Sequence, residues 1–265
     1  MPVEMAALAA DLAAESAVTR ALVAGLGEPG WHTPTPAAGW DVADQIGHLA
    51  YFDEVAVRAA IHPGEFRAEL AAAPENIYPD TIAARYRDRT GAQTLAWFEG
   101  ARARLLETFG TLDPATRLPW FGPDMSAASS LTARLMETWA HTQDIADALG
   151  VTREPTGRLR HVAHIGVGAR AYSYAARGRT PPPEPVRVEL TAPDGTLWTW
   201  GPPGAGDRVT GTALDFCLLV TQRRHRDDLD LTVTGPGAQE WMAIAQAFAG
   251  PPGQGRPPRR RQPDE

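Results

Sequence analysis

Three side chains of types that commonly bind metals set the first hypothesis: His48, Glu137 and His141. Glu137 and His141 are four residues apart in a stretch, residues 131–150, whose pattern predicts an unbroken helix, so both project from one face about one turn apart. His48 lies on the apolar side of a second predicted helix within residues 39–54. If these helices pack antiparallel, two imidazoles and a carboxylate meet. Such a set suits a catalytic zinc or similar divalent metal that keeps one coordination position open.

Spacing alone is weak support, because surface helices also carry Glu and His four residues apart for solubility and side-chain pairing. The apolar neighbours of the pair recur at helical spacing and predict that Glu137 and His141 lie beside or within a buried stripe: Leu131, Leu135, Thr138, Ile145 and Leu149. A buried carboxylate needs a cation or hydrogen bonds to offset its desolvation, and a metal supplies this.

Two sequence patterns together point to a family. Residues 39–50 read Gly-Trp-Asp-Val-x-Asp-x-x-x-His-Leu-Ala, and residues 137–144 read Glu-x-x-x-His-x-x-Asp. The combination resembles the DinB-like superfamily, specifically its mycothiol-dependent maleylpyruvate isomerase branch. The resemblance covers residues 1–177 and implies a four-helix bundle with an extra helix, in which His48, Glu137 and His141 bind zinc or another divalent metal. Residues 186–250 resemble the smaller α+β C-terminal domain of the same branch.

The resemblance also implies a type of chemistry. Members include thiol transferases, isomerases and proteins of unassigned activity. A metal with three protein ligands can convert a bound thiol to a thiolate, and in this family the thiol is mycothiol. The protein is therefore expected to activate mycothiol for transfer to, or isomerisation of, a small electrophilic substrate. A thiol-independent metal hydrolase or lyase and a non-catalytic metal-binding protein stay open, as does the choice among zinc, nickel, iron and manganese.

Composition limits the other classes of function. The 265 residues carry a net charge of −7 and contain arginine but no lysine, so no overall charge favours nucleic-acid binding. The only cysteine, Cys217, lies in an apolar run and is expected to be a buried, unreactive thiol. The acidic N-terminus lacks a signal-peptide pattern, and no apolar run approaches the roughly 20 residues that span a bilayer. We expect a cytoplasmic protein and a homodimer. The absence of lysine and the many Ala, Gly and Pro residues suggest a coding sequence rich in G and C, which fits an actinobacterial origin.

Gly and Pro residues mark the boundaries between the predicted helices and domains. The predicted bundle helices begin near residue 3, at residue 42 after an Asp41 cap, at residue 80 or 81, and after a cap at residue 124 or 126. A fifth helix is predicted for residues 157–177, and the Pro-rich stretch of residues 180–185 marks a domain boundary. This gives a bundle domain at 1–179, an α+β domain at 184–250, and a disordered Pro/Arg-rich tail at 251–265.

Further residues are candidates for supporting roles in the bundle. Asp144, three residues beyond His141, can orient an imidazole N–H or serve as a salt-bridge partner. Trp120, Phe121 and Met125 lie in a loop that, by the resemblance, is near the metal, and are candidate walls of a substrate pocket.

Two further clusters lie outside the triad. Arg223 and Arg224 belong to the densest positive cluster of the second domain and can hold a substrate carboxylate, although a solvated helix end has the same pattern. His161 and His164, one turn apart, form a rival metal pair without a matching third ligand.

Overall fold

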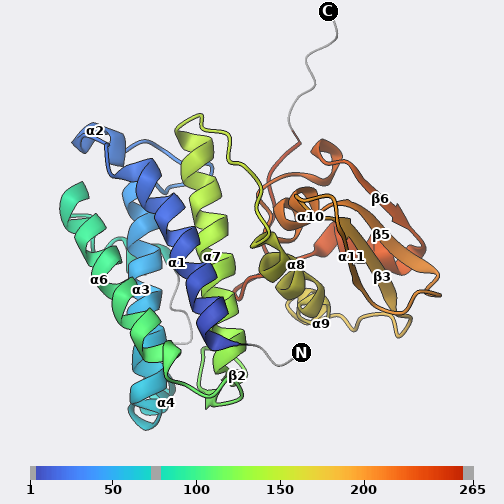
Figure 1. Ribbon diagram of the computed structural model, residues 1–265, viewed down its shortest axis with the longest axis horizontal. Coiled ribbons are helices and arrows are strands. Elements are labelled where there is room, and N and C mark those ends of the chain that lie inside the picture. The colour runs from blue at the N-terminus through green and yellow to red at the C-terminus, as the bar shows by residue number, and fades with distance from the viewer. Residues whose placement is uncertain (1–3, 73–78, 259–265) are drawn as a thin grey trace, which may run out of the picture. The chain divides into compact units, whose positions relative to one another are not determined.

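The structure, a computed structural model, describes residues 4–72 and 79–258. The chain divides into two compact units, Met1–Arg153 and Glu154–Glu265. The first is built mainly of helices and the second combines helices with a four-stranded sheet (Figure 1). The expected fold class, mainly α with a C-terminal α+β part, is confirmed.

Four long helices form the bundle of the first unit: α1 (Met5–Val23), α3 (Val42–Ile61), α6 (Gly91–Gly110) and α7 (Ala127–Ala148). Each packs on two others in the cyclic order α1, α7, α3, α6 (Figure 1). The central apolar cluster takes side chains from all four helices and from the short α2 (Glu28–Trp31), and its buried members are Val23, Trp31, Val42, Ile46, Leu49, Ala50, Phe98, Ala101 and Ile145. Burying these faces stabilises the bundle and fixes which sides of α3 and α7 meet.

The start of α3 confirms the cap predicted from sequence. The Asp41 carboxylate accepts the N–H of Asp44 at 2.9 Å, and the Asp44 carboxylate accepts the N–H of Asp41 at 3.2 Å, which is a capping box. At the other end of α3, the structure adds a feature that the sequence did not predict. Pro63 follows the end of α3 and also starts a new helix, α4 (Pro63–Ala72). A proline at the first helical position loses no hydrogen bond there, which explains the start of α4. The proline ring also disfavours a helical conformation of the preceding residue, His62, which explains the end of α3.

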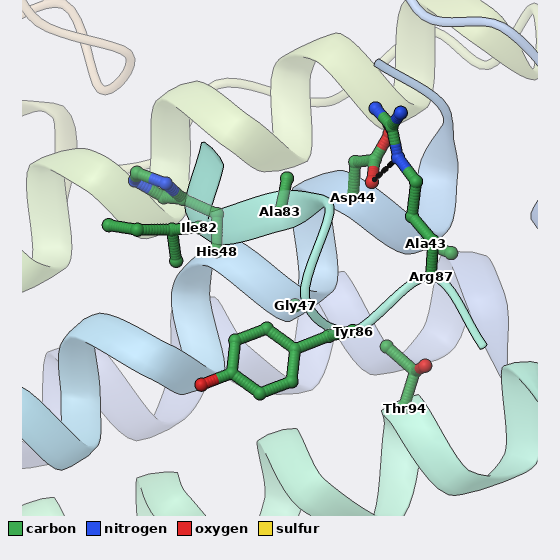
Figure 2. Close-up of a pocket in the computed structure, with 9 residues that line it drawn as sticks. All are labelled: Ala43, Asp44, Gly47, His48, Ile82, Ala83, Tyr86, Arg87 and Thr94. Atoms are coloured by element: carbon green, nitrogen blue, oxygen red, sulfur yellow. Dashed lines mark hydrogen bonds and ion pairs between the residues drawn. The ribbon is translucent and has the colours of Figure 1, made fainter. Parts of the chain in front are cut away.

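The third predicted helix is in fact two. The short α5 (Pro79–Ala83) ends before residue 84, and α6 starts afresh after Thr90, which caps it together with Gln93. Between them, Arg87 donates from Nε and Nη2 to the two carboxylate oxygens of Asp44 at 3.0 and 2.9 Å (Figure 2). This contact holds the connecting segment against α3, so tertiary structure replaces the continuous helix that the pattern predicted.

Gly91, the first residue of α6, lies against the Trp31 ring. A Cβ at this position would be 2.2 Å from Trp31 Cδ1. We predict that Gly91→Ala lowers the free energy of unfolding by about 1–3 kcal/mol, because the buried indole has to move. Gly100→Ala on the same helix is the control: the nearest atom to its Cβ is 3.6 Å away. That change should stabilise the protein by about 0.5–1 kcal/mol, and urea denaturation that ranks the two alike contradicts this packing.

A small hairpin leads into α7. The loop expected around Trp120, Phe121 and Met125 contains a strand pair: β1 (Arg117–Leu118) and β2 (Met125–Ser126) pair antiparallel, with Leu118 opposite Met125. The hydroxyl of Ser126 accepts the N–H of Ser129 at 3.1 Å and caps α7, which confirms one of the two predicted caps.

The second unit contains a sheet in the order β4-β3-β5-β6. Its strands are β3 (Val186–Thr191), β4 (Leu197–Trp200), β5 (Asp207–Thr212) and β6 (Leu231–Thr234). The β3–β4 hairpin turns at Gly195, whose φ of +82° suits glycine. Strands β3 and β5 run parallel, with Val188 opposite Val209.

Helices complete this unit and shift the domain boundary. They are α8 (Leu159–Gly168), α9 (Arg170–Ala175), α10 (Ala213–Val220) and α11 (Pro236–Ile244), with a short 3-10 helix η1 (Arg226–Asp228). The single helix expected for residues 157–177 is interrupted at Ala169. Because α8 packs on α10 and α9 on α11, the second unit starts at Glu154, earlier than the boundary expected near residue 179.

The chain beyond residue 250 begins in contact with the second unit. The Gln246 side chain donates to the carbonyl of Pro251 at 3.2 Å and accepts the N–H of Gly253 at 3.1 Å. The arginine run of residues 259–261 lies outside the described residues, and the disorder expected for the tail stays a prediction there. Within the described ranges, the structure holds no helix with the length and apolar character that crossing a membrane requires.

Candidate metal centre

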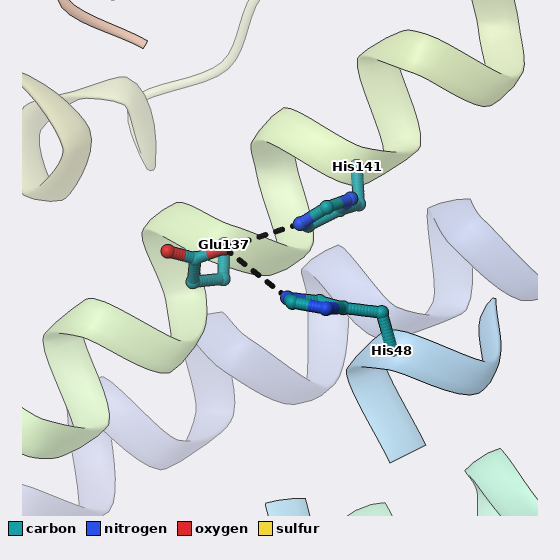
Figure 3. A group of neighbouring side chains, drawn as sticks. All are labelled: His48, Glu137 and His141. Carbon is teal, nitrogen blue, oxygen red and sulfur yellow. Dashed lines mark hydrogen bonds and ion pairs between the residues drawn. The ribbon is translucent and has the colours of Figure 1, made fainter. Parts of the chain in front are cut away.

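The three predicted ligands converge between α3 and α7. Glu137 Oε2 lies 3.2 Å from His141 Nε2 and 3.8 Å from His48 Nε2 (Figure 3). One donor atom from each residue falls within 4.8 Å of the other two. His48 comes from α3, whereas Glu137 and His141 are one turn apart on α7, so the packing of these two helices assembles the group.

The triad is largely withdrawn from water. The side chains of His48, Glu137 and His141 are 11%, 20% and 10% exposed. Burial, and next the nearby His141, lower the pKa of His48 to about 4, so this imidazole is neutral and able to coordinate at neutral pH. Burial alone would raise the pKa of Glu137, but the adjacent His141 and His48 imidazoles outweigh it and hold that pKa well below its usual value. Glu137 is therefore an anion enclosed by two imidazoles.

This donor set fits a divalent metal. Two ligands that each lie about 2.0–2.1 Å from a tetrahedral zinc are about 3.3 Å apart. The separations of Glu137 Oε2 from the two imidazoles, 3.2 and 3.8 Å, lie at and slightly beyond this value. Two nitrogens and one carboxylate also match the ligand types of catalytic zinc sites, which leave a further position for water or substrate. A metal here would also neutralise a carboxylate that is otherwise costly to bury.

The other nitrogen of His141 is held by a residue that sequence reasoning missed. His141 Nδ1 makes a very short hydrogen bond with Oε1 of Gln45, a side chain that is 0% exposed. Both ring nitrogens of His141 thus face groups other than Asp144, which is buried further along α7. Gln45 holds this nitrogen because α3 presents it across the helix interface. Both roles considered for Asp144, an acceptor that orients an imidazole and a salt-bridge partner, stay predictions.

Aromatic rings surround His48. Its ring centroid lies 4.6 Å from that of Phe52 and 5.3 Å from that of Trp40. Phe52 in turn lies 6.3 Å from Trp120 and 6.0 Å from Phe121. Trp120 and Phe121, two of the three predicted pocket residues, are thus one ring removed from His48, and their role in substrate binding stays a prediction.

A small cavity of about 20 Å³ lies on another side of His48, between α3, α5 and α6 (Figure 2). Tyr86 and Thr94 line it together with the Asp44–Arg87 pair. This volume accommodates about one water molecule, which is far smaller than a substrate pocket.

The candidates in the second unit are placed as follows. Arg223 and Arg224 follow α10, where their guanidinium groups donate to the main-chain carbonyls of Thr221 and Arg223, and carboxylate binding by them stays a prediction. His164 Nδ1 accepts from Trp200 Nε1 at 3.3 Å. Within the residues described here, His161 and His164 belong to no group of three metal-binding side chains.

Cys217 cannot serve as a ready nucleophile. The side chain is 0% exposed within α10, and burial raises the pKa of its thiol well above the usual value. This confirms the expectation of a buried thiol, which is unreactive in its protonated form.

A second missed feature is a buried ionic network next to the triad. Asp53 accepts from Arg102 Nε at 2.6 Å and from Arg134 Nε at 2.9 Å, and its side chain is 0% exposed. Arg102 also donates to Thr138 Oγ1 at 2.9 Å and makes a very short hydrogen bond to Ser16. The network thereby joins α1, α3, α6 and α7. A signal existed in the sequence, since Arg102 occupies a core position of the apolar repeat that includes Phe98, Leu105 and Phe109.

Fold and site together define a class: a helical bundle that carries two histidines and one carboxylate able to hold a metal ion, followed by a small α+β domain. Residues 12–146, half of the chain, match the family described as mycothiol maleylpyruvate isomerase N-terminal domain. The protein belongs to this family, which confirms the resemblance inferred from the motifs. Residues 182–234 match a second family, described as wyosine base formation.

Similar proteins extend over nearly the whole chain. An uncharacterised protein found in two strains of Mycobacterium tuberculosis is 50% identical over 249 residues, covering 93% of this chain and 97% of the relative. Crystal structures of a mycothiol-dependent maleylpyruvate isomerase and of a histidine-to-alanine mutant superpose with TM-scores of 0.59 and 0.60. They are 16% and 15% identical and cover 89% of this chain and 96% of their own. Because the sequence identity is this low, the two crystal structures show that the fold is shared and carry no further argument about this chain.

Proposed function

We propose that the protein is a divalent-metal-dependent enzyme that activates mycothiol for addition to a small electrophilic substrate, leading to isomerisation or thiol transfer. The observation that carries the proposal is the convergence of His48, Glu137 and His141 at one point of a bundle that belongs to the mycothiol maleylpyruvate isomerase family. Zinc is the metal that this donor set favours most simply, although other divalent metals accept the same ligands.

The residues have separable roles. His48, Glu137 and His141 would hold the metal, which when bound lowers the pKa of a thiol and so supplies a thiolate near neutral pH. The chain has one cysteine, Cys217, and it is buried, so the reacting sulfur belongs to the small-molecule thiol. Trp40 and Phe52 line the histidines and limit the access of water. We assign Trp120 and Phe121 to the substrate wall and Arg223 and Arg224 to a substrate carboxylate.

The reaction is balanced without an added oxidant or reductant. The thiolate sulfur forms a bond to an electrophilic carbon of a double bond, and the electron pair moves onto the substrate. Isomerisation follows when the resulting single bond rotates and the thiol is expelled with its electron pair, which restores the double bond. Thiol transfer follows when the adduct takes up a proton and is released.

Calorimetric titration of mycothiol into the zinc-loaded protein tests the proposal. We expect saturable binding with release of about one proton per site, measured as a dependence of the heat on buffer ionisation, because a coordinating thiol is deprotonated. S-methyl mycothiol, which has no ionisable thiol, should bind at least about tenfold more weakly because it forms no charged sulfur ligand. Equal binding of the two compounds, or none, overturns the thiol mechanism. Chelator-sensitive hydrolysis in thiol-free buffer would then favour a metal hydrolase.

A further inference from the structure

Gln45 links His141 to a turn that precedes α3. Its Oε1 contacts His141 Nδ1, and its Nε2 donates to Thr35 Oγ1 at 2.8 Å. The Thr35 hydroxyl donates to the carbonyl of Trp40 at 2.9 Å, and the Thr35 N–H reaches the same carbonyl at 2.8 Å. We call this chain of contacts the Thr35–Gln45 relay.

The relay has a fixed direction. A main-chain carbonyl only accepts, so the single hydroxyl proton of Thr35 goes to Trp40 and leaves the Thr35 oxygen as the acceptor for the amide of Gln45. The Gln45 NH₂ group therefore faces Thr35, and its oxygen faces His141. Because that oxygen only accepts, His141 Nδ1 has to be the donor.

The direction of the relay determines which nitrogen of His141 is free to bind a metal. With the proton on Nδ1, neutral His141 presents the lone pair of Nε2 toward Glu137 Oε2, 3.2 Å away. Two acceptors at this distance repel unless a cation lies between them. We propose that the Thr35–Gln45 relay is a positioning device that fixes the tautomer of His141, so that Nε2 is the metal-binding atom. The inference rests on the proposed metal-dependent function.

The two histidines differ in this respect. His48 Nδ1 is buried without a hydrogen-bond partner in the described part of the protein, whereas His141 Nδ1 is held by Gln45. Loss of the relay should therefore act on the metal through His141 alone. Partners of ligating imidazoles typically change metal affinity by about 10–100-fold when they are removed.

Zinc affinity, measured by competition with a chromophoric chelator, tests the relay by substitution. Gln45→Leu should weaken zinc binding by about 10–100-fold, and Thr35→Val should weaken it by a smaller factor. Gln45→Glu places a carboxylate opposite His141 Nδ1, and both carboxylate oxygens accept hydrogen bonds, so Thr35 is no longer needed to orient the side chain. This variant should therefore keep the wild-type zinc affinity, and adding Thr35→Val to it should not lower that affinity. Gln143→Leu removes another largely buried glutamine of the bundle, which pairs with Asp147 at 2.9 Å, and should leave zinc affinity unchanged. Equal losses for Gln45→Leu and Gln143→Leu overturn the proposal.

A measurement of the His141 tautomer in the metal-free protein tests this inference independently of the proposed function. Long-range ¹H–¹⁵N spectra of histidine in the metal-free protein, at a pH where imidazoles are neutral, should show His141 as the Nδ1–H tautomer. Gln45→Leu should shift it toward the Nε2–H form that free imidazoles of histidine prefer. An Nε2–H tautomer in the wild-type protein contradicts the relay even if zinc binds. The Nδ1–H tautomer in a protein that binds no zinc supports the relay and rejects the metal-dependent function.

Discussion

Replacing Asp53 by alanine is expected to lower the free energy of unfolding by about 3–5 kcal/mol. The Asp53 carboxylate is the shared acceptor of Arg102 and Arg134, whose side chains are each 4% exposed. Its removal leaves two buried guanidinium groups in the bundle core without the counter-charge that they share. Desolvated charges that lose their partner are among the few features that produce losses of this size.

Glu54, the next residue along α3, provides a matched control. It pairs with Arg104 at 2.8 Å, but these side chains are 41% and 55% exposed. An exposed ion pair contributes at most about 1 kcal/mol, so Glu54→Ala should change stability little. Urea denaturation of both variants measures the difference. If the two substitutions cost the same, the Asp53 network does not have the stabilising role assigned to it.

Replacing His141 by alanine is expected to weaken zinc binding by more than about 100-fold, because loss of a ligand exceeds the effect of losing a ligand's hydrogen-bond partner. The imidazole supplies one of the three candidate donors in the described part of the chain, and the remaining His48–Glu137 pair is separated by 3.8 Å. Chelator competition and metal content of the purified protein measure the change. His48→Ala should have an effect of similar size.

His164→Ala is the control for this loss. His164 belongs to the rival pair with His161, and its Nδ1 bonds to Trp200 in the second unit. The variant should keep full zinc content and wild-type affinity. Loss of zinc from His164→Ala with retention in His141→Ala would place the metal at the rival pair.

Sequence reasoning identified the three side chains that converge in the structure because their signals are local. Glu137 and His141 lie one helical turn apart, and the capping box of Asp41 and Asp44 starts the helix that carries His48. Such patterns depend on residues within a few positions of each other, so they can be recognised without knowledge of the tertiary structure.

The groups around the ligands depend on contacts between helices. Gln45 and Asp53 each act on a residue of α7 far along the chain, and nothing in their own neighbourhoods specifies the partner. The same limit explains the third helix, which was expected to be continuous. The contact of Arg87 with Asp44 on α3 holds a non-helical connection that helix periodicity alone cannot anticipate.

X-ray absorption at the zinc edge tests the central claim most directly, with spectra of the zinc-loaded protein before and after mycothiol is added. The account predicts only nitrogen and oxygen neighbours at about 2.0–2.1 Å at first, and one sulfur at about 2.3 Å after mycothiol is added. The chain's own thiol, Cys217, is buried in the second unit and belongs to no metal-binding group among the described residues, so the new sulfur would be that of mycothiol. A zinc shell that saturating mycothiol leaves unchanged would contradict the account.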